Sequence, residues 1–245
     1  MSWNSVLKPV GFAIALAFGA GVAIANPLVV KSSGPSAARF KPGTAPADNS
    51  RITLKAGDTV VILDGRGTRT LRGPGTFSPE APSTALAETR RAPVQASGTR
   101  ARIGAVRGIA GIGDSTRNPN IWFIDVDKSA KICVTDPKSL TLWRGGDRAP
   151  ATMTIASNGK SDRINWVQNQ SVKDWPQSLP IIDGAIYTIS QKGRPATTLR
   201  FLVIESRSTG LEDTASLLIR NGCQAQLDLL VETISVPGSA AEPAS

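Results

Sequence analysis

The chain of 245 residues contains no histidine, one tyrosine and only two cysteines, and aromatic residues make up 5% of it. Without histidine the protein lacks the most common general base near neutral pH and the most common metal ligand. Two cysteines alone cannot complete a tetrahedral zinc site. The composition therefore disfavours metallohydrolases, histidine-dependent triads and zinc modules. We expect no catalytic residue, no metal site and no bound cofactor.

Apolar and charged residues are present in the proportions of a globular protein, at 40% and 19% of the chain. The formal net charge is +9, and the excess is unevenly placed. Residues 26–117 are strongly basic, whereas residues 118–245 carry as many acidic as basic side chains. This asymmetry favours an anionic partner for the N-terminal half.

The N-terminus has the pattern of a secretory signal peptide. Lys8 precedes an uncharged, mostly apolar stretch, Val10–Ile24, which ends in the small-x-small sequence Ala23-Ile24-Ala25. This stretch is short for a bilayer span, which needs about 20 residues. We expect cleavage near Ala25 and a periplasmic mature protein. The alternative is an uncleaved N-terminal membrane anchor.

The two cysteines, Cys133 and Cys223, are an even pair in a chain expected to enter an oxidising compartment. A structural disulfide is the usual outcome for such a pair. The alternative is two buried free thiols. A redox-active site is disfavoured because the chain contains no C-x-x-C sequence.

Composition and alternation predict a mainly β fold in several segments. A small β unit is predicted over residues 26–78, with a hairpin around Asp64-Gly65. About fifty residues are too few to form a stable core by themselves. The unit should therefore pack against another part of the chain. The expected segments are a signal peptide (1–25), a small β unit (26–78), a basic linker rich in Ala, Pro and Arg (79–117), an immunoglobulin-like β-sandwich with C-terminal helices (118–236) and a disordered tail (237–245).

Seven short strand patterns separated by turn residues predict the β-sandwich. After residue 205 the apolar period becomes helical, which predicts one helix from Leu211, stopped at Asn221-Gly222, and a second over 223–233. We expect this helical hairpin to cover the sandwich. The predicted strands are 121–126, 131–135, 140–144, 151–156, 163–167, 185–190 and 197–205.

Arginines are the candidate anion-binding residues, with lipopolysaccharide, lipid, a wall polymer or an acidic protein as ligand. The alternative is a linker whose charge only keeps it solvated. Nucleic acid is not expected as a partner of an exported chain without a basic face interleaved with aromatic residues. The candidates are Arg66, Arg69, Arg72, Arg90, Arg91, Arg100, Arg102 and Arg107.

Trp175 is the candidate contact residue for a protein partner. It precedes Pro176 in a segment without a strand pattern, and an exposed loop tryptophan is a common interface anchor. The alternative is packing in the core.

The segment Ile52–Gly65 (ITLKAGDTVVILDG), with Gly73–Phe77 (GPGTF), resembles the β-repeats of FecR-like periplasmic domains. A second pattern is similar to uncharacterised exported proteins of alphaproteobacteria. The first resemblance implies a signalling or regulatory partner of a membrane protein, and it supplies no catalytic residue. The second pattern comprises Ile121-Trp122, Cys133, Leu142-Trp143-Arg144, Trp175-Pro176, Leu179-Pro180 and Tyr187.

These observations together predict an exported, non-enzymatic periplasmic protein. Its expected role is that of an interaction or signalling-accessory module for an envelope or membrane protein. The alternative is an envelope protein that binds an anionic polymer or lipid through its basic N-terminal half.

Overall fold

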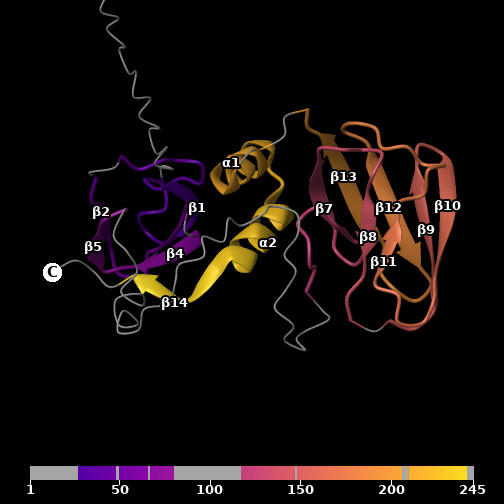
Figure 1. Ribbon diagram of the computed structural model, residues 1–245, viewed down its shortest axis with the longest axis horizontal. Coiled ribbons are helices and arrows are strands. Elements are labelled where there is room, and N and C mark those ends of the chain that lie inside the picture. Colours follow the sequence, from indigo (N-terminus) through magenta and orange to yellow (C-terminus); the bar gives the residue numbers. More distant parts are fainter. Residues whose placement is uncertain are drawn as a thin grey trace, which may run out of the picture.

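The computed structural model describes residues 27–47, 50–65, 67–79, 117–146, 148–205, 208 and 210–241. The predicted signal peptide (1–25) and nearly all of the predicted linker (79–117) lie outside these residues. The described part is mainly β with two helices, which confirms the predicted fold class. It is arranged as an N-terminal β unit, a pair of helices and a β-sandwich, in that order across the molecule (Figure 1).

The N-terminal β unit has a sheet of order β1-β3-β4-β14, in which β14 (Ser235–Ala241) is the C-terminal strand, and a separate two-stranded ladder, β2-β5. A tight hairpin joins β3 to β4, with Asp64 paired to Gly67. Gly67 has a φ of 128°, which an L-residue with a side chain rarely adopts. The strands are β1 (Leu28–Ser33), β2 (Ile52–Leu54), β3 (Thr59–Asp64), β4 (Gly67–Arg72) and β5 (Gly75–Phe77).

The β-sandwich consists of a five-stranded sheet of order β10-β9-β12-β13-β7 and a three-stranded sheet of order β11-β8-β6. Burial alternates along its strands, as in β13, where Leu199 and Phe201 are buried and Thr198 and Arg200 are exposed. The strands are β6 (Ile124–Asp125), β7 (Ala130–Val134), β8 (Thr141–Trp143), β9 (Ala151–Ser157), β10 (Lys160–Trp166), β11 (Val172–Asp174), β12 (Ile186–Gln191) and β13 (Thr197–Val203).

Tyr187, at the start of β12, fixes the corner that leads into this strand. Its hydroxyl donates to the carbonyl of Pro180 at 2.6 Å and accepts the N–H of Ile182 at 3.1 Å. A tyrosine that bonds back to the backbone before its strand is a hallmark of immunoglobulin-like sandwiches. The ring itself is buried. The structure thus supplies a sandwich feature that the sequence patterns did not identify.

The two helices, α1 (Leu211–Asn221) and α2 (Gln224–Ile234), lie between the N-terminal β unit and the sandwich (Figure 1). Gly222 ends α1 in the left-handed conformation, as predicted. The helices share a core with β1 and β3, and α2 also contacts β7. The hairpin lies against the sandwich, as expected, and it also supplies the packing surface that the small β unit needs. The shared core includes Leu28, Val30, Leu63, Ala215, Leu218 and Leu227.

The C-terminal segment forms a strand, β14 (Ser235–Ala241), which pairs in parallel with β4. It begins directly where α2 ends (Figure 1). The predicted disordered tail, 237–245, is therefore corrected for residues 237–241, while residues 242–245 lie outside the described part. Local sequence could not show this pairing because the partner strand lies more than 160 residues earlier.

Candidate functional site

The disulfide between Cys133 and Cys223 confirms the predicted pairing. It joins Cys133, the second-to-last residue of β7, to the residue before α2, and both cysteines are fully buried. No free cysteine is found among the described residues. The bond therefore fixes the N-terminal end of α2 against the edge of the sandwich.

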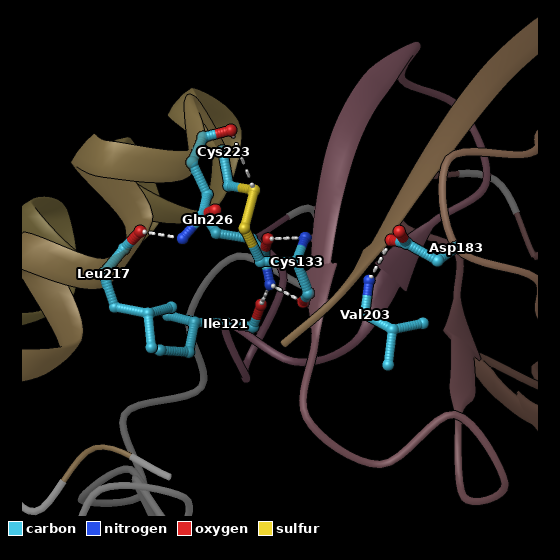
Figure 2. The surroundings of a disulfide bond; sticks show 8 residues. Ile121, Cys133, Asp183, Val203, Leu217, Cys223 and Gln226 are labelled. Atoms are coloured by element: carbon cyan, nitrogen blue, oxygen red, sulfur yellow. Dashed lines mark hydrogen bonds between the residues drawn. A yellow bond between two sulfur atoms is a disulfide. The ribbon is translucent and has the colours of Figure 1, made fainter. Parts of the chain in front are cut away.

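Gln226, in the first turn of α2, makes a second connection to the same strand. Its side-chain oxygen accepts the N–H of Cys133 at 2.7 Å. Its side-chain nitrogen donates to the carbonyls of Cys133 and Ile121, both at 3.0 Å. Figure 2 shows the carboxamide reaching from the helix to the strand, beside the disulfide. The side-chain amide of Gln226 thus bonds both the N–H and the C=O of Cys133, as the backbone of a neighbouring strand would. Gln226 is almost completely buried.

Next to this contact, no described strand pairs with the outer edge of β7. Within the described part of the chain, β7 is the last strand of its sheet and pairs with β13 alone. Successive residues of a parallel strand direct their N–H and C=O groups to opposite sides. Val134 bonds toward the β13 side, by accepting the N–H of Ile204 at 2.8 Å, and Cys133 bonds away from it to Gln226. Lys131 therefore turns its N–H and C=O outward, and no described residue bonds to them.

A groove of about 420 Å³ runs between α2 and the residues that lead into and along β7. This volume lies within the range of small-ligand and side-chain sites. Ala130 and Ile132, which flank Lys131, both line the groove. Its other lining residues are Arg117, Asn118, Ile121, Phe123, Asp125, Lys128, Ala225, Gln226, Asp228, Leu229 and Glu232.

Charged side chains lie beside the apolar residues of the groove and are paired, although Asp228 pairs at 3.7 Å with Lys31, which does not line the groove. Arg117 lies 3.9 Å from Glu232, and Lys128 lies 3.4 Å from Asp125. Burial raises the pKa of Asp125, although the N–H of Asp127 and the charge of Lys128 act in the opposite direction. The groove thus combines apolar side chains, paired charges and one partly buried carboxylate.

Replacing Asp125 by asparagine should change how stability depends on pH. The raised pKa means that the folded wild type binds a proton more readily than the unfolded chain, so wild-type stability falls as pH rises above the usual value of 3.8. The asparagine side chain would keep the acceptor for the N–H of Asp127 but would not titrate. We expect the urea midpoint of the variant to increase relative to that of the wild type as pH rises above 3.8. At still higher pH the difference between the two midpoints should become constant. A pH-independent difference would contradict the assignment.

Trp175 lies in the sandwich core and has only 7% of its surface exposed. Its ring packs edge-to-face against Tyr187 and Phe201, and its indole N–H donates to the carbonyl of Leu179 at 2.6 Å. The assignment of Trp175 as a candidate partner contact is therefore corrected, and the packing alternative describes it. Trp175 follows β11, a three-residue strand that the sequence patterns did not identify, which is why it resembled a loop residue.

The candidate arginines are not assembled into one described site. Arg69 is buried, pairs with Asp64 at 3.3 Å and also donates to the carbonyl of Pro79. The buried guanidinium of Arg69 is used in contacts within the β unit. The prediction that Arg69 contacts an anion is therefore corrected. Arg72 is exposed at the end of β4. The remaining candidates, Arg66, Arg90, Arg91, Arg100, Arg102 and Arg107, lie outside the described residues.

Sequence reasoning missed the groove and its two main features, Gln226 and the open edge of β7. Gln226 lies three residues after Cys223 and four before Leu230, so it shares their helix face. A polar residue on an otherwise apolar face was the available signal. The open edge had no signal, because it depends on which strand ends the sheet.

Comparisons of the chain with models of protein families, with curated proteins and with solved structures give no match. Within the described residues, no helix is long and apolar enough to cross a membrane. The fold and the groove therefore carry the functional argument by themselves.

Proposed function

We propose that the protein is an exported, non-enzymatic periplasmic module that binds an envelope or membrane protein through the groove between α2 and β7. The open edge of β7 at Lys131, next to a groove lined in part by apolar side chains, carries this proposal. Peptide recognition by strand addition uses these elements: backbone groups at a sheet edge give affinity, and neighbouring pockets select side chains. The bound segment would be an extended stretch of the partner.

The surroundings of the groove support this role because they hold it in shape. The disulfide and the Gln226 amide fix α2 relative to β7, so that binding need not order this surface first. A disulfide also suits an oxidising compartment such as the periplasm. The proposed signal peptide and the FecR-like resemblance point to the same compartment.

The test is recovery of partners from envelope extracts with the mature chain, residues 26–245. Ala225 is exposed on α2 and lines the groove, so Ala225→Arg would obstruct the groove without changing the core. Gln224→Arg is the matched control, because Gln224 is exposed on the same turn and does not line the groove. We expect the control to retain one envelope protein that Ala225→Arg loses. Equal recovery by both variants would contradict the proposal.

A second arm tests the anion-binding alternative. The same recovery is repeated at high salt and with Arg90, Arg91, Arg100 and Arg102 changed to glutamine. Binding through the groove should persist in both conditions, because an added strand is held by backbone hydrogen bonds and by apolar side chains of the groove such as Ile132 and Leu229. Lipid or wall polymer that is recovered from wild type and lost in both conditions would instead support the alternative, since exposed charge contacts weaken with salt.

A further inference from the structure

The pleat of β7 determines which side chains of a partner segment enter the groove, given the strand addition at Lys131 under the proposed function. Successive side chains of a strand point to opposite faces. Ala130 and Ile132 line the groove, whereas the Lys131 ammonium lies beside Gly222, at the end of α1. A residue added opposite Lys131 would therefore point away from the groove. Its two neighbours, which are two positions apart, would point into it.

The start of β7 brings one of these neighbours close to Asp125. Ala130, the first residue of β7, lies two positions after Lys128, whose ammonium is 3.4 Å from the Asp125 carboxylate. The same carboxylate accepts the N–H of Asp127 at 3.0 Å. Ala130, Lys128 and Asp125 all line the groove. A side chain that enters opposite Ala130 therefore has a carboxylate within reach.

The other end of the site is apolar. Ile132 is followed by Cys133, whose N–H and C=O are both bonded to Gln226, so an added strand cannot continue its backbone bonds there. Leu229, about one turn beyond Gln226 on α2, also lines the groove. A side chain that enters opposite Ile132 therefore meets apolar atoms, and burial of an apolar residue there is favourable.

The charge of Asp125 is poorly compensated where it lies. Its side chain is 16% exposed, whereas that of Lys128 is 74% exposed, and an ion pair with so exposed a partner contributes little. Burial raises the pKa of Asp125, so its surroundings disfavour the negative charge. A second cation that enters the groove would stabilise this charge.

We propose, on the basis of the proposed function, that the groove selects a segment in which a lysine or arginine and an apolar residue lie two positions apart. The cation pairs with Asp125 and releases the Lys128 ammonium to solvent, and the apolar side chain packs at Ile132. The direction of the added strand determines which of the two comes first. Since Asp125 is partly buried, salt screens this ion pair less than an exposed one.

Selection of displayed random heptapeptides on the mature chain, residues 26–245, tests this specificity. Asp125→Asn removes the charge and keeps an acceptor for the N–H of Asp127. Asp127→Asn is the matched control, because Asp127 lies two residues away, pairs with Arg194 and does not line the groove. Ala225→Arg obstructs the groove and identifies peptides that bind elsewhere. The dissociation constant of the strongest peptide is then measured for each variant.

We expect wild type and Asp127→Asn to enrich peptides with a cation and an apolar residue at that spacing. Asp125→Asn should weaken the strongest peptide at least about tenfold. Replacing the cation of that peptide by alanine should weaken its binding to wild type by a similar factor and change its binding to Asp125→Asn little.

Two kinds of result would overturn the proposal. Peptides that need the open groove but carry no cation, or whose cation is insensitive to Asp125→Asn, would contradict this specificity and leave the proposed function standing. Failure to enrich any peptide, or peptides that bind Ala225→Arg as well as wild type, would contradict the specificity and the proposed function together.

Discussion

Replacing Gln226 by glutamate is expected to lower the free energy of unfolding by roughly 3–5 kcal/mol at neutral pH. The substitution places a charge in a buried site and removes the side-chain N–H groups that donate hydrogen bonds there. The side-chain nitrogen that serves the carbonyls of Ile121 and Cys133 would become an acceptor facing two acceptors. Only the bond from the N–H of Cys133 would survive. Urea or thermal denaturation of the mature chain measures the loss.

This effect should depend on pH in a defined direction. Burial and the two carbonyls would raise the pKa of the introduced carboxyl group in the folded state, so the variant should lose stability relative to wild type as pH rises above about 4, the ordinary glutamate value. Gln224→Glu is the matched control, because Gln224 is exposed on the same helix. We expect the control to change stability by less than about 0.5 kcal/mol. Similar losses in the two variants would show that Gln226 does not close the edge of β7.

Removing the disulfide with Cys133→Ala and Cys223→Ala is expected to lower the free energy of unfolding by roughly 4–5 kcal/mol. The bond closes a loop with a sequence separation of 90 residues, and the chain-entropy model assigns this magnitude to such a loop. Alanine leaves no buried polar group in place of the cysteines. The denaturant midpoint, compared at equal slope, gives the difference.

Reducing agent provides the internal control for this prediction. It should destabilise the wild type under unfolding conditions by a similar amount and leave the double-alanine variant unchanged. A loss below about 1 kcal/mol in the variant would mean that the Gln226 contacts and the helix packing fix α2 without the bond. The proposed role of the disulfide in holding the groove would then be wrong.

Local patterns were sufficient to predict most of the strands and both helices. β9 and β13 follow alternating stretches with turn residues at their ends, and both were expected within a few residues of their positions. Gly222 ends α1 because glycine adopts the left-handed conformation at little cost. The disulfide was predictable as well, because two cysteines in a chain with a predicted signal peptide have only each other as partners. In each case the physical cause lies within a few residues or in the predicted compartment.

The arrangement of these elements was less predictable, because it depends on contacts between distant segments. Nothing near Leu211 indicates that α1 shares a core with Leu28 and Leu63, which lie 183 and 148 residues earlier and form part of the same cluster. Trp175 resembled a loop residue because β11 has only three residues, too few for a visible alternation. β14 escaped prediction because Pro237 and Gly238 disfavour a strand, and only the free side of β4 makes one possible.

The candidate site could not be predicted from the sequence for the same reason: it depends on contacts between distant segments. Neither the open edge at Lys131 nor the groove beside it belongs to any one segment of sequence. Both arise because β7 ends its sheet, while Gln226 and the disulfide hold α2 at a fixed place along that edge. The outward N–H of Lys131 leaves no signature in the sequence, because every residue except proline has a backbone N–H.

Hydrogen exchange of the mature chain, alone and with the partner recovered from the envelope, tests the central claim most directly. The amide of Lys131 should exchange rapidly in the free protein, whereas the amide of Cys133, bonded to Gln226, should be protected. Partner binding should slow exchange at Lys131 and at the groove-facing part of α2 around Ala225 and Leu229. Protection that appears on β10, at the opposite edge of the sheet, with Lys131 unchanged would contradict the account.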